Sequence, residues 1–214
     1  MIRKMEDLTG LSRKEREKLF RKQEIQLAAA KLFAEKGFNN TTLEDIAASA
    51  EFGIGTIYNY FQSKEEIFRS IIQSFFEDYV QVTLNVDKQA NGLVEFLRIY
   101  TEKTFEYLSK SKAALTMLVS YYTTNGCEGP ANMHKDSFKA MHCQMDDRVI
   151  ERIKKGVENK EIRDVNPQYL YYCYRSMVFP YITQVVKNNM LNEYNTKEHA
   201  EFILGILFNG ILEK

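Results

Sequence analysis

Residues 41–66 read TTLEDIAASAEFGIGTIYNYFQSKEE. Thr42 can cap a helix, and Asp45, three residues later, supplies the acidic partner of a capping box. Ile46 lies in an apolar stripe at helical spacing, and the EFGIG segment then breaks the pattern. A second short helix is expected over residues 54–60. Two short helices joined by a tight turn predict a helix-turn-helix, whose second helix fits the major groove of DNA.

The helix expected over residues 54–60 has an apolar face and a face of small and polar side chains. Ile57 and Phe61 would anchor it inward, while the other face enters a groove about 12 Å wide. Small and amide side chains can read base edges, whereas hydroxyls and a lysine can bind phosphate and set the register. The predicted DNA-binding residues are Thr42, Gly55, Thr56, Tyr58, Asn59, Tyr60 and Lys64.

A long helix is expected before this segment, from Ser12 to Lys36, with Gly37 as its stop. Its first part, residues 13–22, reads RKEREKLFRK and carries six positive against two negative side chains. Two interpretations stay open for this run: contact with the DNA backbone, or an ordinary solvated helix face.

The stretch from Thr41 to Glu66 closely resembles the DNA-binding segment of the tetracycline-repressor (TetR-type) family of transcriptional regulators. The matching positions are Thr42, Asp45, Ile46, Ala47, Ala50, Gly55, Thr56, Tyr58, Tyr60, Phe61, Ser63, Lys64 and Glu65. The sequence departs from the family pattern in the turn, where Glu51 replaces a usual glycine, Gly53 a serine cap, and Ile54 a frequent polar residue. Glu51 is therefore expected to accept backbone strain or a different turn geometry.

The resemblance implies an all-α protein with two domains. Residues 1–65 would form a three-helix DNA-binding domain, with residues 1–12 weakly ordered. Residues 66–214 would form a helical domain that binds a ligand and forms a homodimer through its last two long helices. No internal repeat and no alternating strand pattern speaks against this architecture.

The last helix, AEFILGILFNGIL at residues 200–212, is apolar almost all round. A terminal helix of that kind must be buried on both sides, and a two-fold contact with a second copy achieves this burial. Complete burial within one subunit is the alternative. The predicted interface residues are Phe179, Val186, Phe202, Gly205, Ile206, Asn209 and Gly210.

Aromatic and sulfur-bearing side chains in the second domain are candidates to line a ligand pocket, although each of them also fits an ordinary core. Arg175 lies among apolar residues and calls for a carboxylate partner or a ligand anion, unless it reaches solvent. The predicted ligand-binding residues are Phe105, Met117, Tyr121, Phe138, Met141, His142, Met145, Tyr171, Tyr174, Arg175 and Met177.

Other classes of function find little support. The three cysteines form no CxxC pair, and the spacing of His134, His142 and Cys143 matches no common metal site, so neither a metal nor a cofactor is expected. No nucleophile–base arrangement or phosphate loop indicates an enzyme. No apolar segment of about 18 residues predicts a membrane span, and a cytoplasmic location is expected.

The sequence therefore predicts a homodimeric repressor that binds a pseudo-palindromic operator in double-stranded DNA and is released by a small, largely apolar ligand. A DNA-binding architectural or cell-division factor without such an inducer is the main alternative, and a helical protein-interaction module is a third.

Overall fold

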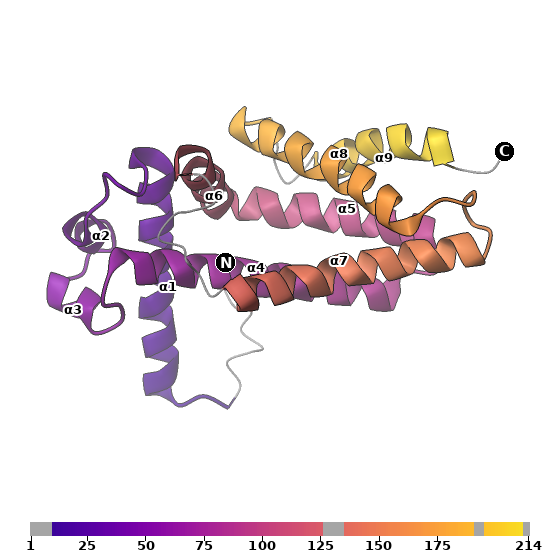
Figure 1. The fold of residues 1–214 in the computed structure, drawn as a ribbon. Helices are drawn as coiled ribbons and strands as arrows, with labels where there is room; N and C mark the ends of the chain where they lie inside the picture. Colours follow the sequence, from indigo (N-terminus) through magenta and orange to yellow (C-terminus); the bar gives the residue numbers. More distant parts are fainter. Residues whose placement is uncertain (1–9, 126–134, 191–194, 212–214) are drawn as a thin grey trace. The chain divides into compact units, whose positions relative to one another are not determined.

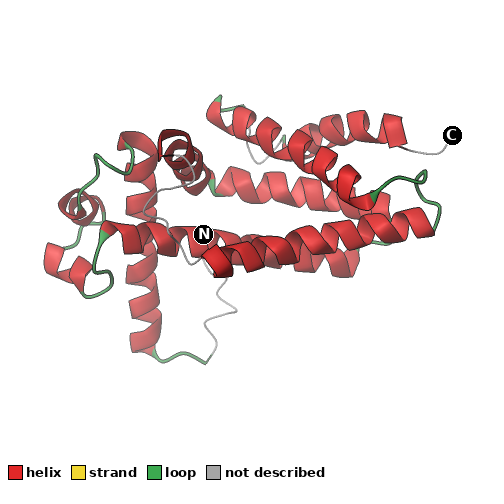
Figure 2. Cartoon of the chain, viewed as in Figure 1, coloured by secondary structure: helices red, strands yellow, loops and turns green. Residues whose placement is uncertain are grey.

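The computed structural model of the chain describes residues 10–125, 135–190 and 195–211, without the side chains of residues 121–145 and 210–211. All elements in these ranges are helices, and Figure 2 shows no strand among them. This confirms the predicted all-α class. In chain order the helices are α1 Arg13–Lys36, α2 Leu43–Ser49, α3 Ile54–Tyr58, α4 Lys64–Gln89, α5 Leu93–Lys110, α6 Lys112–Asn125, α7 Lys135–Glu158, α8 Pro167–Lys187 and α9 Thr196–Ile211 (Figure 1).

Local capping chemistry explains where several helices begin. Ser12 and Glu15 form a capping box at α1, and Thr42 and Asp45 form one at α2. Asn166 accepts two backbone N–H groups at the start of α8, where Pro167 takes the first helical position. Pro suits that position because the N–H that it lacks would have no intrahelical partner there.

One helix end differs from the sequence-based expectation. α3 ends at Tyr58 rather than Tyr60, because the N–H groups of Asn59 and Tyr60 bond to the carbonyls of Thr56 and Ile57 in a tighter, three-residue pattern. α4 continues to Gln89, and α8 ends at Lys187.

The described chain divides into two compact units, which we describe separately. Unit 1 contains residues up to Phe75 together with the segment from Ala113, and unit 2 contains Phe76–Lys112 and the segment from Lys135. α4 thus contributes its first half to unit 1 and its second half to unit 2. The predicted domain boundary between residues 65 and 66 remains a prediction.

The core of unit 1 joins the first four helices. α1 contributes Phe33, whose ring centroid lies 5.7 Å from that of Phe68 in α4, and Phe38 between the two helices lies 5.2 Å from each. Ile46 of α2 and Ile57 of α3 are completely buried. Burial of these side chains removes apolar surface from water and fixes the two short helices on the longer ones.

In unit 2, α5 contacts α7, α8 and α9, and α8 also contacts α7 and α9. The core of unit 2 includes Phe96, Phe105, Ile153, Ile182 and Leu204, each at most 1% exposed. None of the described helices is both long and apolar enough to cross a membrane.

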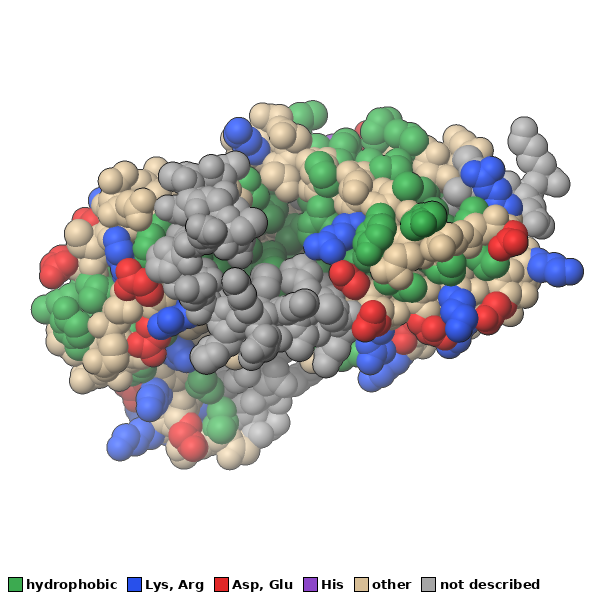
Figure 3. All heavy atoms as spheres, in the orientation of Figure 1, with side chains coloured by type: hydrophobic (Ala, Val, Ile, Leu, Met, Phe, Trp, Pro, Cys, Tyr) green, Lys and Arg blue, Asp and Glu red, His purple; other side chains and the backbone are tan. Residues whose placement is uncertain are grey.

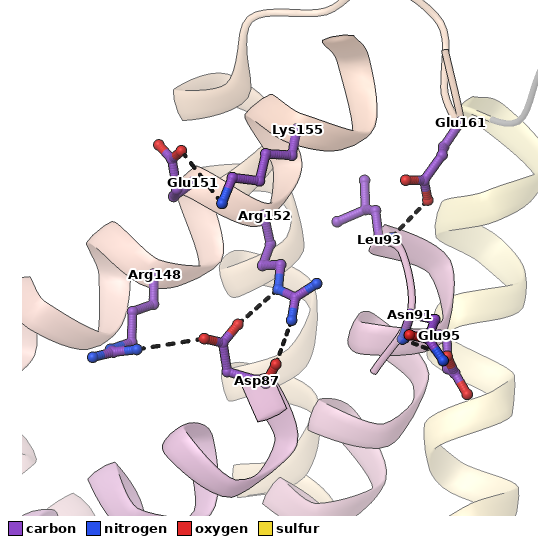
Figure 4. A network of polar contacts seen from close by, with 9 residues as sticks. All are labelled: Asp87, Asn91, Leu93, Glu95, Arg148, Glu151, Arg152, Lys155 and Glu161. Atoms are coloured by element: carbon purple, nitrogen blue, oxygen red, sulfur yellow. Dashed lines mark hydrogen bonds and ion pairs between the residues drawn. The ribbon is translucent and has the colours of Figure 1, made fainter. Parts of the chain in front are cut away.

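The corner between α4 and α5 is held at several points by α7 and by the loop that follows it (Figure 4). Arg152 donates to the Asp87 carboxylate at 2.6 Å and to its backbone carbonyl, and Arg148 reaches the same carboxylate at 3.5 Å. Glu161 accepts the backbone N–H of Leu93 at 2.6 Å. The two arginines compensate for an acidic side chain at the C-terminal end of α4, where the helix dipole disfavours negative charge.

Candidate DNA-binding site

The second helix of the helix-turn-helix, α3, separates an inner from an outer face within five residues. Its inner face is Ile57, which is 0% exposed, and the following Phe61 is also buried. On the outer face Ile54 is 37% exposed and Tyr58 is 47% exposed, and Gly55 and Asn59 are exposed as well. Outward side chains above a buried anchor are what a groove-reading helix requires.

The remaining predicted DNA-binding residues flank this face. Thr56 and Tyr60 are half-buried, and Thr42 is exposed at the start of α2. Gly53 is the N-cap of α3 and makes no side-chain cap. Lys64 is half-buried at the start of α4, so all seven predicted residues are at least partly open to solvent.

The turn between α2 and α3 contains the expected irregularity at Glu51. Glu51 has φ +58°, a left-handed conformation that a non-glycine residue adopts at some cost. Gly53 has φ −67° and does not share this conformation. Of the two outcomes expected at Glu51, the chain thus shows the strained backbone. The Glu51 N–H still bonds to the Ala48 carbonyl at 3.2 Å.

At the start of α2, the cap occupies part of the hydrogen-bonding capacity of Thr42. Its Oγ1 accepts the N–H of Asp45 at 3.1 Å, and Asp45 accepts the N–H of Thr42 at 3.1 Å. The Thr42 N–H lowers the pKa of Asp45 from its usual value, and the nearby Lys36 ammonium adds to this. The hydroxyl hydrogen of Thr42 stays available as a donor to a phosphate oxygen.

Lys64 behaves differently from the other predicted residues. Its ammonium lies 3.0 Å from the carbonyl oxygens of Phe38 and Thr41 and 3.3 Å from that of Asn39. It also lies 4.7 Å from the centroid of the Phe38 ring. The lysine ammonium therefore donates to the protein's own backbone. The sequence had predicted that Lys64 binds DNA, and it gave no sign of these carbonyl contacts.

The basic run at the start of α1 is exposed. Arg13, Lys14, Arg16 and Lys18 have exposed side chains, and Glu17 forms a 2.6 Å ion pair with Arg21 one turn later. Both interpretations of this run, backbone contact and solvated face, remain open.

Among the predicted ligand-binding residues, Phe105, Tyr171 and Tyr174 are buried in unit 2, and Arg175 and Met177 are half-buried there. Met117 is buried in unit 1, so the structure does not group it with the others. The side chains of the other five lie outside the described residues: Tyr121, Phe138, Met141, His142 and Met145.

A buried network of hydroxyl groups surrounds the tyrosines of α8. Tyr174 shares a hydrogen bond of 2.9 Å with Thr101, and Tyr79 shares one of 2.9 Å with Tyr100 and one of 3.1 Å with Thr104. Burial raises the pKa of Tyr79, Tyr100 and Tyr174, so their hydroxyls stay protonated and able to donate. Sequence reasoning missed Tyr79 and Tyr100, although a tyrosine within an apolar helical stripe already calls for a polar partner.

Arg175 has a carboxylate partner. Its Nη1 lies 3.0 Å from Asp146 of α7, and the Tyr171 hydroxyl donates to the same carboxylate. Of the alternatives left open for Arg175, the structure therefore supplies the carboxylate partner.

The residues predicted for a dimer interface fall into two groups. Phe202 is 57% exposed, Ile206 and Asn209 are exposed, and a Cβ on Gly205 would meet no atom within 4 Å. In contrast, Val186 is 3% exposed, so it belongs to the core of its own unit and has no surface to offer. Phe179 is half-buried, with its ring 6.5 Å from that of Tyr79, and Gly210 is among the residues whose surroundings are not described.

Taken together, the all-helical fold and the outward-facing α3 define a helix-turn-helix of the kind that transcriptional regulators use. Residues 25–71 match the family described as bacterial regulatory proteins, tetR family. This match agrees with the resemblance of residues 41–66 to the DNA-binding segment of that family.

Similar proteins match part of the chain. An uncharacterized HTH-type transcriptional regulator of Bacillus subtilis, YfiR, is 30% identical over 102 residues, which are 41% of this chain and 50% of that protein. The HTH-type transcriptional repressor KstR2 of Mycobacterium tuberculosis is 35% identical over 80 residues, 34% of this chain and 40% of KstR2. The matched part thus spans half or less of these relatives.

Solved structures resemble the chain over most of its length. The structure of the ketosteroid regulator KstR2 of Mycobacterium tuberculosis has a TM-score of 0.75 and 20% identity, covering 91% of this chain and 96% of that one. The structure of AibR in complex with isovaleryl coenzyme A and operator DNA has a TM-score of 0.69 and 18% identity, covering 88% and 98%. These likenesses establish a TetR-type fold.

Proposed function

We propose that the protein is a homodimeric transcriptional repressor that binds a pseudo-palindromic DNA operator and leaves it when a small, largely apolar ligand binds unit 2. The observation that carries this proposal is the exposed outer face of α3, formed by Ile54, Gly55, Tyr58 and Asn59 above the buried Ile57. These side chains are exposed in unit 1, and the major groove of a bound duplex would cover them.

The two kinds of DNA contact would come from different side chains. Asn59 is exposed at the end of α3 and carries an amide that can bond to an adenine edge in two places. Gly55 lets the backbone approach closely, and Thr56 can contact a base or the methyl group of thymine. The hydroxyls of Thr42, Tyr58 and Tyr60 suit phosphate oxygens, which set the register on the duplex.

A symmetric dimer would present two such faces. The outer surface of α9 is apolar at Phe202 and Ile206 and open at Gly205, and hydrophobic side chains gather on the α8–α9 part of the face seen in Figure 3. A two-fold contact places the same patch on both subunits and removes it from water. Two α3 helices would then read half-sites about 34 Å apart, or a small multiple of that distance.

A ligand site in unit 2 is supported by its chemistry and by one structural neighbour. Buried hydroxyls of Tyr79, Tyr100 and Tyr174 lie among aromatic side chains, which provides polar anchoring points in an apolar interior. AibR, which has a similar fold, was crystallised with isovaleryl coenzyme A and operator DNA. An acyl thioester combines an apolar chain with a carbonyl acceptor that a tyrosine hydroxyl can bind.

Selection of bound duplexes from a random DNA pool tests the proposed function most directly. We expect enrichment of an inverted repeat whose half-sites lie on one face of the helix. The affinity for this repeat should fall steeply as salt is added, because bound phosphates release counterions. A pool that shows no enrichment, with binding no stronger than to arbitrary duplexes, would contradict a sequence-specific repressor.

Replacing Asn59 with alanine should alter base preference rather than general affinity. We expect a loss of about 1–3 kcal/mol of discrimination at one base pair of each half-site, because a bidentate amide–base contact disappears. Competition between operator variants measures this. Ser49→Ala, an exposed side chain at the end of α2, serves as the control. An unchanged ranking of operators would remove Asn59 from the base-reading set.

Acyl thioesters should stabilise the protein and release it from the operator. At a ligand concentration of about 100 times Kd, binding contributes about 2.7 kcal/mol, which corresponds to a rise in Tm of roughly 5–10 °C. Isovaleryl coenzyme A and a long-chain acyl coenzyme A are the probes, with free coenzyme A as the control. If neither probe shifts Tm or the operator affinity, an architectural factor without such an inducer becomes the better interpretation.

A further inference from the structure

The position of Lys64 within unit 1 suggests a role that its place in the sequence does not. Lys64 is the first residue of α4 and follows directly on the segment that carries α2 and α3. The three carbonyl groups that bind its ammonium, those of Phe38, Asn39 and Thr41, lie in the turn that leads into α2. The lysine therefore connects the entry and the exit of the helix-turn-helix segment, which are 23–26 residues apart in the sequence.

The hydrogen-bonding capacity of the lysine is used up by these contacts. An ammonium group has three N–H donors and no acceptor, and here three carbonyl oxygens lie within 3.0–3.3 Å. Hydrogen bonds from a charged donor are about twice as strong as neutral ones. The Phe38 ring, 4.7 Å from Nζ, adds a cation–π contact. To reach a phosphate, Lys64 would have to give up these partners.

The turn that Lys64 holds also has short-range hydrogen bonds of its own. Thr41 Oγ1 donates to the Gly37 carbonyl at 2.9 Å, and Asn40 Nδ2 donates to the Lys36 carbonyl at 3.1 Å. These bonds shape the turn but do not attach it to α4. The hydrogen bonds from Lys64 supply that attachment, and the packing of Phe38 on Phe68 supports it.

We propose that Lys64 is a positioning residue that ties the two ends of the helix-turn-helix together, and that it does not bind phosphate itself. This inference rests on the proposed DNA-binding function. By holding the turn before Thr42 against the start of α4, Lys64 keeps α2 and α3 in one orientation in the protein without DNA. A reading surface that is already ordered loses less conformational entropy on binding.

The salt dependence of operator binding separates a positioning role from a phosphate contact. Each phosphate neutralised contributes about 0.9 to the slope of log K against log salt concentration. Loss of a direct contact in both subunits would therefore lower the magnitude of the slope by about 1.8, and would weaken binding to arbitrary duplexes as well. Loss of a positioning residue lowers affinity for the operator at every salt concentration and leaves the slope unchanged.

The experiment compares Lys64→Gln and Lys64→Arg with the wild-type chain over a series of salt concentrations, with the active fraction of each protein first titrated against excess operator. We expect both variants to bind the operator about tenfold more weakly, with the wild-type slope and the wild-type affinity for arbitrary duplexes. Lys64→Arg keeps the charge, but a planar guanidinium does not fit three converging carbonyl groups. Lys36→Gln, which removes a charge from the same turn and a single ion pair, is the matched control and should change affinity less than twofold.

Three outcomes would overturn the inference. A smaller slope for Lys64→Gln combined with wild-type affinity for Lys64→Arg would identify a phosphate contact. A reduced active fraction with unchanged affinity of the active molecules would indicate a role in stability alone. Wild-type behaviour of both variants would show that the carbonyl contacts do not affect DNA recognition. Failure of the proposed function is a separate result, because then the wild-type chain itself would show no operator preference.

Discussion

Replacing Phe202 with glutamate is expected to make the protein monomeric and to weaken operator binding by at least about a hundredfold, or about 2.7 kcal/mol. The Phe202 ring is 57% exposed and stacks on Tyr181, with ring centroids 5.8 Å apart, on the open face that also carries Ile206. A two-fold contact over this face would bury two carboxylates close together. Burying unpaired charge costs several kcal/mol per ion, which a dimer of this kind cannot offset.

Sedimentation equilibrium measures the subunit association, and a titration with operator DNA measures the affinity. Met190→Glu is the matched control, because it also places a carboxylate at an exposed apolar position of unit 2 but lies beyond the end of α8. We expect the control to remain dimeric. A Phe202→Glu protein that sediments as an intact dimer would exclude the α9 face as the interface.

Replacing Ile57 with alanine should destabilise the DNA-binding unit by about 2–4 kcal/mol, because the substitution leaves a cavity beneath α3. Ile57 is 0% exposed and is the buried side chain of a helix only five residues long. So short a helix has little stability of its own and depends on such packing. Urea unfolding followed by circular dichroism measures the loss, and operator affinity should fall with it.

Ile54→Ala is the matched control for Ile57→Ala. Both residues are isoleucines of α3, but Ile54 is 37% exposed. We expect the Ile54 variant to change stability by less than about 0.5 kcal/mol, as surface substitutions usually do. Any change in its operator affinity then reports on contact with DNA. Equal losses of stability in both variants would contradict the inward and outward faces assigned to α3.

Where helices begin, and which face of α3 is exposed, could be predicted from short-range patterns. Ser12, Thr42 and Asn166 cap their helices with side chains that reach only two or three residues along the chain. The spacing of Ile57 against Gly55 and Asn59 sets the two faces of α3, because a helix repeats every 3.6 residues. Strain at Glu51 was one of the two outcomes expected there, since the turn lacks the glycine that adopts a positive φ freely.

Side chains whose partners lie far away in the sequence could not be assigned in this way. Val186 and Phe202 are both apolar residues of long helices, yet the first is 3% exposed and the second 57% exposed. Arg175 was expected to meet a carboxylate, a ligand anion or solvent, and only the fold selects the carboxylate of Asp146, 29 residues earlier. A lysine beside a helix start suits a phosphate equally well, but the folded chain directs the ammonium of Lys64 to three carbonyl groups.

Residue types and their spacing were thus enough to predict an all-helical chain with a helix-turn-helix near its N-terminus, because caps, turns and helical periodicity act over a few residues. The partner of each charge, and the side of each apolar helix that remains exposed, depended on the folded chain. Those properties arise when distant segments pack and exclude water from some surfaces but not from others.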